Sequence, residues 1–180
     1  MKSTNKAVRD RKSLRDDTGL DRIDRQILAL LQADGRRPVA DIAREVHLSV
    51  TPCAERVRRL ERAGVIRRYV ALLDPQRLGQ HLVAYVQIVL DRTTPDVFER
   101  FQEAMHGLDE VMECHMVAGG FDYLLKVRVR DMAEYRRVLG AQIAALRGVQ
   151  HTHTYFVMDE VKSTHALRVR GPAGEATPAA

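Results

Sequence analysis

The chain contains little of what several protein classes require. It has two cysteines, Cys53 and Cys114, too few for a disulfide framework and with no partner spacing for a metal site. No run approaches the 18 or so apolar residues of a membrane-spanning helix, and no apolar segment follows the basic N-terminus as in a secretory signal. These absences argue against secreted disulfide-rich and membrane proteins, and we expect a cytoplasmic protein.

Catalytic motifs are also missing. The sequence has no pairing of a nucleophile with a base, no glycine motif for phosphate and no convergent pair of acids, so an enzyme is disfavoured and no cofactor is expected. His151 and His153 fall on one face of a predicted strand, which keeps a metal-sensing module as an alternative. No cysteine or carboxylate stands at a matching spacing, so no metal site is predicted.

What the chain does have is charge, distributed unevenly. Of its 180 residues, 29% are charged and 45% are apolar, which is typical of a globular protein of one large or two small domains. Residues 49–68 carry six arginines against two glutamates, whereas residues 82–161 carry eight basic against twelve acidic side chains. This asymmetry favours a module that binds a polyanion, joined to a module with another task.

Three short amphipathic helices are predicted after a flexible basic arm at 1–19. The first begins near Leu20 and ends at 33–35, the second covers 39–46, and the third runs from Ser49 to Gly64. The links between them are short, which is the helix-turn-helix arrangement. Its third helix lies in the major groove of DNA.

The third helix has an apolar back and a front that carries arginines. Thr51 or a neighbouring hydroxyl residue is expected to cap it, which would place Pro52 where a missing N–H costs little. Guanidinium groups bind phosphates and base edges, although a solvated basic face is the alternative. The DNA contacts predicted on this basis are Ser49, Val50, Thr51, Glu55, Arg56, Arg58, Arg59 and Arg62, with Arg67 and Arg68 meeting the DNA backbone as a wing would.

Beyond the linker at 74–82 the predicted secondary structure changes from helices alone to a mixture of strands and helices. Residues 83–162 predict the order strand, helix, strand, strand, helix, strand, which is the ferredoxin-like pattern; a tail follows at 163–180. Both helices then cover one face of the sheet, and the other face also carries apolar residues such as Tyr85 and Val89. We therefore expect a homodimer formed through this domain. The fold class is α+β, a winged helix-turn-helix followed by a ferredoxin-like βαββαβ domain.

Several blocks resemble the Lrp/AsnC family. They are Leu20–Leu28, Thr51–Glu61, Ala71–Leu73, Pro95–Glu99, Glu113–His115, Gly119–Leu125 and Val157–Lys162. The resemblance covers residues from about 20 to about 168. It implies a transcription regulator at 20–73 that binds double-stranded DNA, an amino-acid-sensing domain, and assembly into dimers and often octamers. A small-molecule or metal-sensing module of the same fold, without a leucine response, is the alternative.

The resemblance also implies an effector pocket between sensing domains of neighbouring dimers, with leucine or another branched-chain amino acid as the effector. Asp122 would meet the ammonium group, and backbone N–H groups of the glycine loop would meet the carboxylate. Carried over by motif, the pocket residues are Met116, Gly119, Gly120, Asp122, Met132, Tyr155, Phe156 and Val157. A turn residue is the alternative for Asp122, and ordinary core is the alternative for each methionine.

Three positions depart from the family pattern. Val50 replaces a common proline, and His47 replaces a glycine at a turn where φ can be positive. Gly120 stands where relatives often carry aspartate, which leaves open the choice of amino acid.

Overall fold

The computed structural model describes residues 19–169, which divide into two compact units. One unit reaches to Ala71 and resumes at Thr164, and the other comprises Leu72–Ser163. The predicted arm, apart from Gly19, and residues 170–180 of the predicted tail lie outside the described residues. Among the described residues, no helix is both long and apolar enough to cross a membrane.

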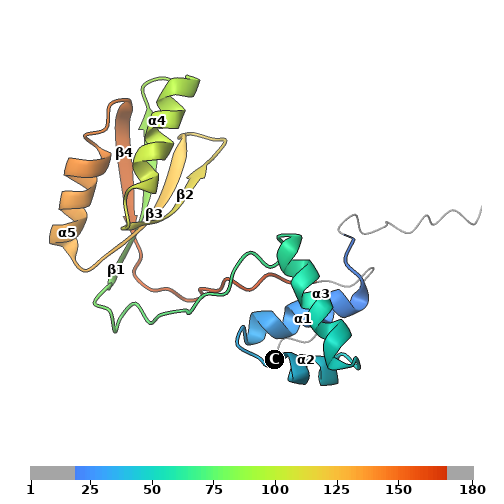
Figure 1. The fold of residues 1–180 in the computed structure, drawn as a ribbon. Helices are drawn as coiled ribbons and strands as arrows, with labels where there is room; N and C mark the ends of the chain where they lie inside the picture. Colours follow the sequence, from blue (N-terminus) through green and yellow to red (C-terminus); the bar gives the residue numbers. More distant parts are fainter. Residues whose placement is uncertain (1–18, 170–180) are drawn as a thin grey trace, which may run out of the picture. The chain divides into compact units, whose positions relative to one another are not determined.

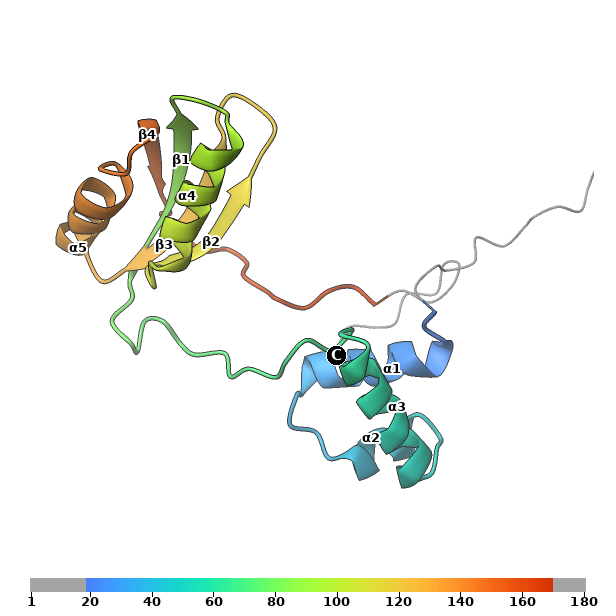
Figure 2. The ribbon, with the colours of Figure 1, turned by 45° about the horizontal axis from the view of Figure 1, so that its top comes forward.

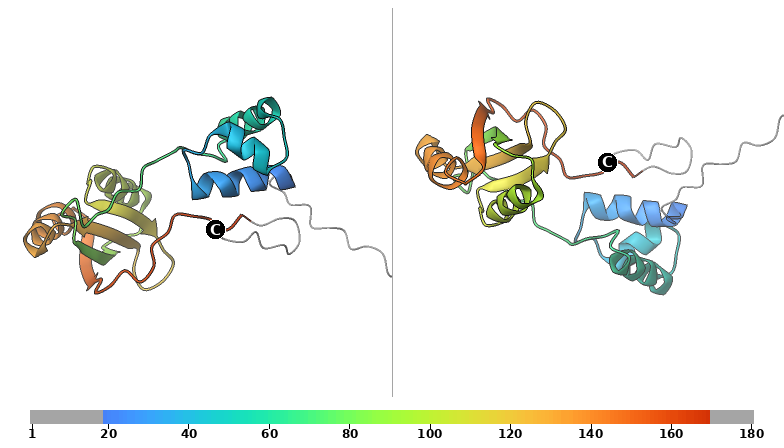
Figure 3. Two further views of the ribbon diagram at one scale, coloured as in Figure 1. Left: turned by 90° about the horizontal axis from the view of Figure 1, so that it is seen from below. Right: turned by 90° about the horizontal axis from the view of Figure 1, so that it is seen from above.

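The first unit is built from the three predicted helices, α1 (Arg22–Ala33), α2 (Val39–Glu45) and α3 (Val50–Arg62), which gather around one core (Figures 1 and 3). Asp21 caps α1, and Asp21 and Asp24 exchange side chain-to-backbone hydrogen bonds in a capping box. The core is a cluster from all three helices: Ile27, Ile42, Ala43, Val46, Cys53, Val57 and Leu60.

The turn between α2 and α3 needs a left-handed residue. His47 has φ of 55°, so the positive φ expected at this position is confirmed. Ser49, not Thr51, occupies the cap position of α3, and it makes no side-chain cap hydrogen bond. Pro52 is therefore the third helical residue, where its missing N–H still costs no intrahelical bond. Residues 67–74 form neither helix nor strand.

The second unit has the predicted strand and helix order. Its elements are β1 (Leu82–Leu90), α4 (Pro95–His106), β2 (Val111–Met116), β3 (Tyr123–Val129), α5 (Met132–Arg137) and β4 (Val149–Phe156). The four strands pair antiparallel in the order β2-β3-β1-β4, so the ferredoxin-like topology is confirmed (Figure 2). The last strand ends at Phe156, six residues before the predicted end of the domain at 162.

The second predicted helix of this unit is not uniform. Asp131 caps α5, its side chain accepting from the backbone N–H of Glu134. The Glu134 carboxylate accepts from the backbone N–H of Arg130 and not from that of Asp131, so the two residues form only half of a capping box. After Arg137 the helix widens into a π-helix, η1 (Val138–Ile143), where the sequence pattern predicted continuous α-helix.

Both helices pack on one face of the sheet. Alternate residues of β1 and β3, from Ala84 to Leu90 and from Tyr123 to Val129, are buried there against α4, α5 and η1. The opposite face is not covered by an element of the described chain. It is less apolar than expected, because Tyr85 and Tyr155 share it with Lys126 and Arg128.

Candidate functional site

The exposed side of α3 carries four residues at the spacing i, i+4, i+7 and i+11: Thr51, Glu55, Arg58 and Arg62. At about 100° per residue these side chains lie within about 60° of one another, opposite the buried Cys53, Val57 and Leu60. We call these four residues the exposed stripe. Within residues 19–169, neither Arg58 nor Arg62 pairs with an acidic side chain. The stripe therefore presents two guanidinium groups without partners.

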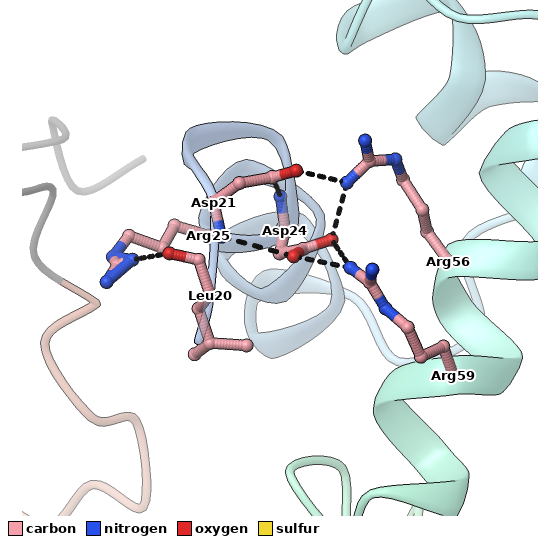
Figure 4. Close-up of polar contacts among 6 residues, drawn as sticks. All are labelled: Leu20, Asp21, Asp24, Arg25, Arg56 and Arg59. Atoms are coloured by element: carbon pink, nitrogen blue, oxygen red, sulfur yellow. Dashed lines mark hydrogen bonds and ion pairs between the residues drawn. The ribbon is translucent and has the colours of Figure 1, made fainter. Parts of the chain in front are cut away.

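Arg56 and Arg59 lie on the flank of α3 and turn toward α1 (Figure 4). One Nη atom of Arg59 donates to both carboxylate oxygens of Asp24, at 2.6 Å each. Arg56 donates at 2.9 Å to Asp24 and at 2.5 Å to Asp21. These two arginines thus bind two carboxylates at the start of α1, an arrangement that the sequence interpretation did not include.

The pairing changes the acid–base properties of its members. Burial opposes ionisation of the Asp21 carboxylate, but hydrogen bonds from the Asp24 backbone and from Arg56 outweigh it and lower the pKa of Asp21. The hydrogen bonds to Asp21 and Asp24 raise the pKa of Arg56. Both changes favour the charged pair.

The other predicted DNA contacts lie around the stripe. Ser49 and Val50 are exposed at the N-terminus of α3. Arg67 and Arg68 are exposed on the irregular segment that follows the helix. Tyr69, in the same segment, donates from its hydroxyl to Glu61 at 3.0 Å. Burial, with the neighbouring Glu61 carboxylate, raises the pKa of Tyr69 to about 12.

The predicted effector residues divide into two groups. Met116, Gly119, Gly120 and Asp122 lie on or beside the β2–β3 loop, where Tyr123 pairs with Ile88. The Asp122 side chain accepts from the backbone N–H of Leu90 at 2.8 Å, which ties the β2–β3 loop to the end of β1. Met116 lies in a groove of about 380 Å³ between β2 and α4, lined also by Met105, Met112 and Cys114.

The second group lies toward the other end of the sheet. Phe156 pairs with Ala84 on β1, and its ring meets that of Tyr135 at 4.9 Å between centroids. Tyr155 and Val157 flank Phe156, and Met132 begins α5 just after β3 ends there. Ala84 and Ile88 are four positions apart on β1, which is about 13 Å along the strand. A single copy of this sheet therefore does not gather both groups around one small molecule.

The two histidines of β4 lie on the open face of the sheet. His153 stacks edge-on against Tyr155, with ring centroids 4.6 Å apart, and His151 is exposed. In the part of the chain that the structure describes, no three His, Cys, Asp or Glu side chains converge in a way that could hold a metal ion.

A helix-turn-helix whose third helix carries two arginines without an acidic partner among residues 19–169, joined to a ferredoxin-like domain, defines the class of helix-turn-helix DNA-binding regulators. Residues 20–61 match the AsnC-type helix-turn-helix domain, and residues 83–167 match the Lrp/AsnC ligand binding domain. The chain belongs to the Lrp/AsnC family of transcription regulators.

Known relatives support the assignment over most of the chain. The leucine-responsive regulatory proteins of Escherichia coli K12 and Klebsiella pneumoniae are each 53% identical over 151 residues, which is 84% of this chain and 92% of theirs. A transcriptional regulator of Neisseria meningitidis, solved with L-methionine, is 34% identical with a TM-score of 0.79, covering 82% of this chain and 96% of its own. An AsnC family regulator of Agrobacterium tumefaciens is 38% identical with a TM-score of 0.78, over the same shares.

Proposed function

We propose that this regulator reads double-stranded DNA with the exposed stripe of α3. The main supporting observation is that Arg58 and Arg62, on the outer side of the third helix of a helix-turn-helix, have no acidic partner in the described part of the chain. Guanidinium groups in this position meet phosphates or base edges, while Thr51 and Glu55 add a hydroxyl and a carboxylate that can meet bases. Ser49 and Val50 lie at the helix start, and the exposed Arg67 and Arg68 supply backbone contacts beyond its end.

The proposed effector is an amino acid, with leucine or another branched-chain amino acid preferred. Supporting this are relatives named leucine-responsive and a relative solved with L-methionine. The methionines along the β2 groove suit an aliphatic side chain. Because the two groups of effector residues lie about 13 Å apart on one sheet, the pocket is completed by a second copy of the chain.

The proposed assembly is a homodimer through the open face of the sheet, with octamers as the larger form. The pairing of Tyr85 with Tyr155 supplies two aromatic side chains on that face, and Val89 adds an aliphatic one. A dimer also brings two copies of α3 to one operator, as two-fold half-sites require.

The first experiment tests DNA binding by the exposed stripe. The full-length protein selects duplexes from a random-sequence pool, with and without leucine, and the enriched duplex is titrated by fluorescence anisotropy. The double variant R58Q/R62Q should bind it far more weakly, with a salt dependence shallower by about two phosphate contacts. If this variant bound as tightly as wild type, the exposed stripe would not be the DNA-binding surface.

Calorimetry tests the effector separately. Leucine should bind the wild-type assembly and D122N should bind it less well. Alanine tests size selectivity, and zinc tests the metal-sensing alternative. Binding of zinc but of no amino acid would favour that alternative.

A further inference from the structure

Asp24 is a buried carboxylate in the helical unit, next to the proposed recognition helix. Its side chain is only 1% exposed, and Asp24 and Arg25 are the charged residues that the described chain buries. A buried carboxylate is costly unless it is paired and hydrogen-bonded. Here its two oxygens accept three bonds from Arg56 and Arg59 and one from the backbone N–H of Asp21. Asp24 is therefore fully satisfied, and both partners come from α3.

The two arginines differ from those of the exposed stripe in what surrounds them. Arg56 is 27% exposed and lies next to the apolar core, whereas Arg59 is 54% exposed and stands between the core and the stripe. Two carboxylates, Asp21 and Asp24, face these two guanidinium groups, so the cluster is close to neutral. Of the four arginines within α3, only Arg58 and Arg62 have no acidic partner among the residues that the structure describes.

From this arrangement we infer that Asp24 is a specificity-determining residue. It withholds Arg56 and Arg59 from DNA phosphates and fixes the rotation of α3 against α1, and so leaves recognition to the exposed stripe. The inference rests on the proposed DNA binding. Phosphate contacts add affinity for every sequence, whereas base contacts discriminate between sequences. A carboxylate that pairs with two flanking arginines therefore lowers the affinity for DNA of any sequence. It does not weaken the base contacts that discriminate between sequences.

The chemistry of the pair favours Asp24 over a phosphate. A phosphate that captured Arg59 would leave the buried Asp24 carboxylate with a single guanidinium partner, Arg56, and removing a partner from a buried carboxylate is unfavourable. The contact that Arg59 would form with a DNA phosphate instead is exposed to solvent, and salt screens it. The Asp24 pairing is therefore retained when DNA binds.

The main test replaces Asp24 with asparagine in the full-length protein, which keeps the shape but removes the charge. Two duplexes are titrated across a salt series, one selected from a random pool by the wild-type protein and one scrambled from it. With Arg59 released, D24N should bind the scrambled duplex more tightly at low salt, with a slope of log K against log salt steeper by about one contact. The ratio of selected to scrambled affinity should fall several-fold.

A matched control removes the same charge elsewhere in the domain. Asp41 pairs with Arg44, one turn away on α2, and with neither arginine of the α3 flank. D41N should leave the ratio of affinities near that of wild type. If D24N instead weakens both duplexes in parallel with an unchanged slope, Asp24 has only a structural role and the inference fails.

Arginine variants test the same inference without touching Asp24. R58Q and R62Q should each make the salt slope shallower by about one contact, whereas R56Q and R59Q should leave it unchanged. Each of the last two variants still leaves Asp24 one guanidinium partner, so both are expected to fold. A slope lowered by about one in R59Q would show that Arg59 meets a phosphate despite Asp24, and would overturn the inference.

A final measurement needs no DNA and separates this inference from the proposed function. Phenylglyoxal modification followed by mass spectrometry should label Arg58 and Arg62 several times faster than Arg56 and Arg59. D24N should abolish the difference for Arg59, whereas Arg56 keeps its ion pair with Asp21 and should stay slow. Equal labelling of all four arginines in the wild type would overturn the inference that Asp24 withholds Arg56 and Arg59. If the two arginines were protected but the protein bound no duplex, only the proposed function would be contradicted.

Discussion

The Nη1 atom of Arg56 on α3 lies 2.5 Å from Oδ2 of Asp21, the residue that caps α1. The same Asp21 carboxylate accepts the backbone N–H of Asp24 at 2.8 Å through its other oxygen. One side chain therefore begins a helix and ties that helix to the proposed recognition helix.

This double role predicts a pH dependence of stability. The pKa of Asp21 in the folded chain is lowered, so its contribution to stability is present above the ordinary aspartate pKa of about 4 and is lost as pH falls through the lowered value. D21N keeps the cap, since asparagine caps as well as aspartate, and removes the ion pair. Hydrogen–deuterium exchange of α1 and α3 amides should show D21N less protected than wild type at pH 7. The two proteins should converge once the pH has fallen below the lowered pKa of Asp21, and a constant difference across the acid range would contradict the assignment.

The left-handed turn at His47 predicts that glycine stabilises the helical unit. A left-handed backbone conformation destabilises a residue with a Cβ by about 1–2 kcal/mol. Glycine avoids this strain, but its greater conformational entropy in the unfolded chain offsets part of the gain in stability. H47G should therefore raise the free energy of unfolding by about 0.5–1 kcal/mol, and H47V should lower it, because φ is 55° here. Exchange rates of α2 and α3 amides measure both, and a destabilising H47G would contradict the prediction.

The pairing of Tyr85 with Tyr155 on the open face predicts where a charge should split the proposed dimer. Y85E should sediment as a smaller species than wild type, because a carboxylate would have to be buried in the interface. Its circular dichroism spectrum should be unchanged. R136E, on an exposed part of α5, serves as the control and should sediment like wild type. An undiminished assembly in Y85E would place the interface elsewhere.

Gly148 predicts a local cost in the second unit. Its φ is +103°, and a Cβ there would meet Cγ1 of Val97 at 3.0 Å. G148A should destabilise the unit by about 1–3 kcal/mol, as expected for a residue forced into sparsely populated backbone space. Gly107 provides a control, since its nearest contact would be an ordinary 3.6 Å. Thermal unfolding of the two variants should differ clearly, and equal midpoints would argue against strain at Gly148.

Much of the fold follows from periodicity alone. Apolar spacing placed α1, α2 and α4 within a few residues, and the alternation around Tyr123 to Val129 placed β3. The change from α5 to the π-helix η1 could not be read in the same way, because Leu139 and Ile143 keep a helical spacing in both forms.

The candidate DNA site was predictable only in part. Helical spacing correctly separated the apolar back of α3 from its charged front. It predicted all four arginines of the helix as DNA contacts and could not show which of them form ion pairs with α1. Which arginines are paired depends on α1, a separate element. One signal was available: acids three residues apart at Asp21 and Asp24, and arginines three residues apart at Arg56 and Arg59. Matching such pairs between helices requires the packing of one helix on another, which a single helix does not encode.

The position of the proposed effector residues at two ends of the sheet has a genetic consequence. If each pocket takes the Asp122 end from one copy and the Phe156 end from another, two defective proteins can repair each other. A variant damaged at Asp122 and a variant damaged at Phe156, each unable to respond alone, would form mixed assemblies in which some pockets receive two intact ends. Restored response in a cell that produces both variants would identify the effector site as a property shared between subunits.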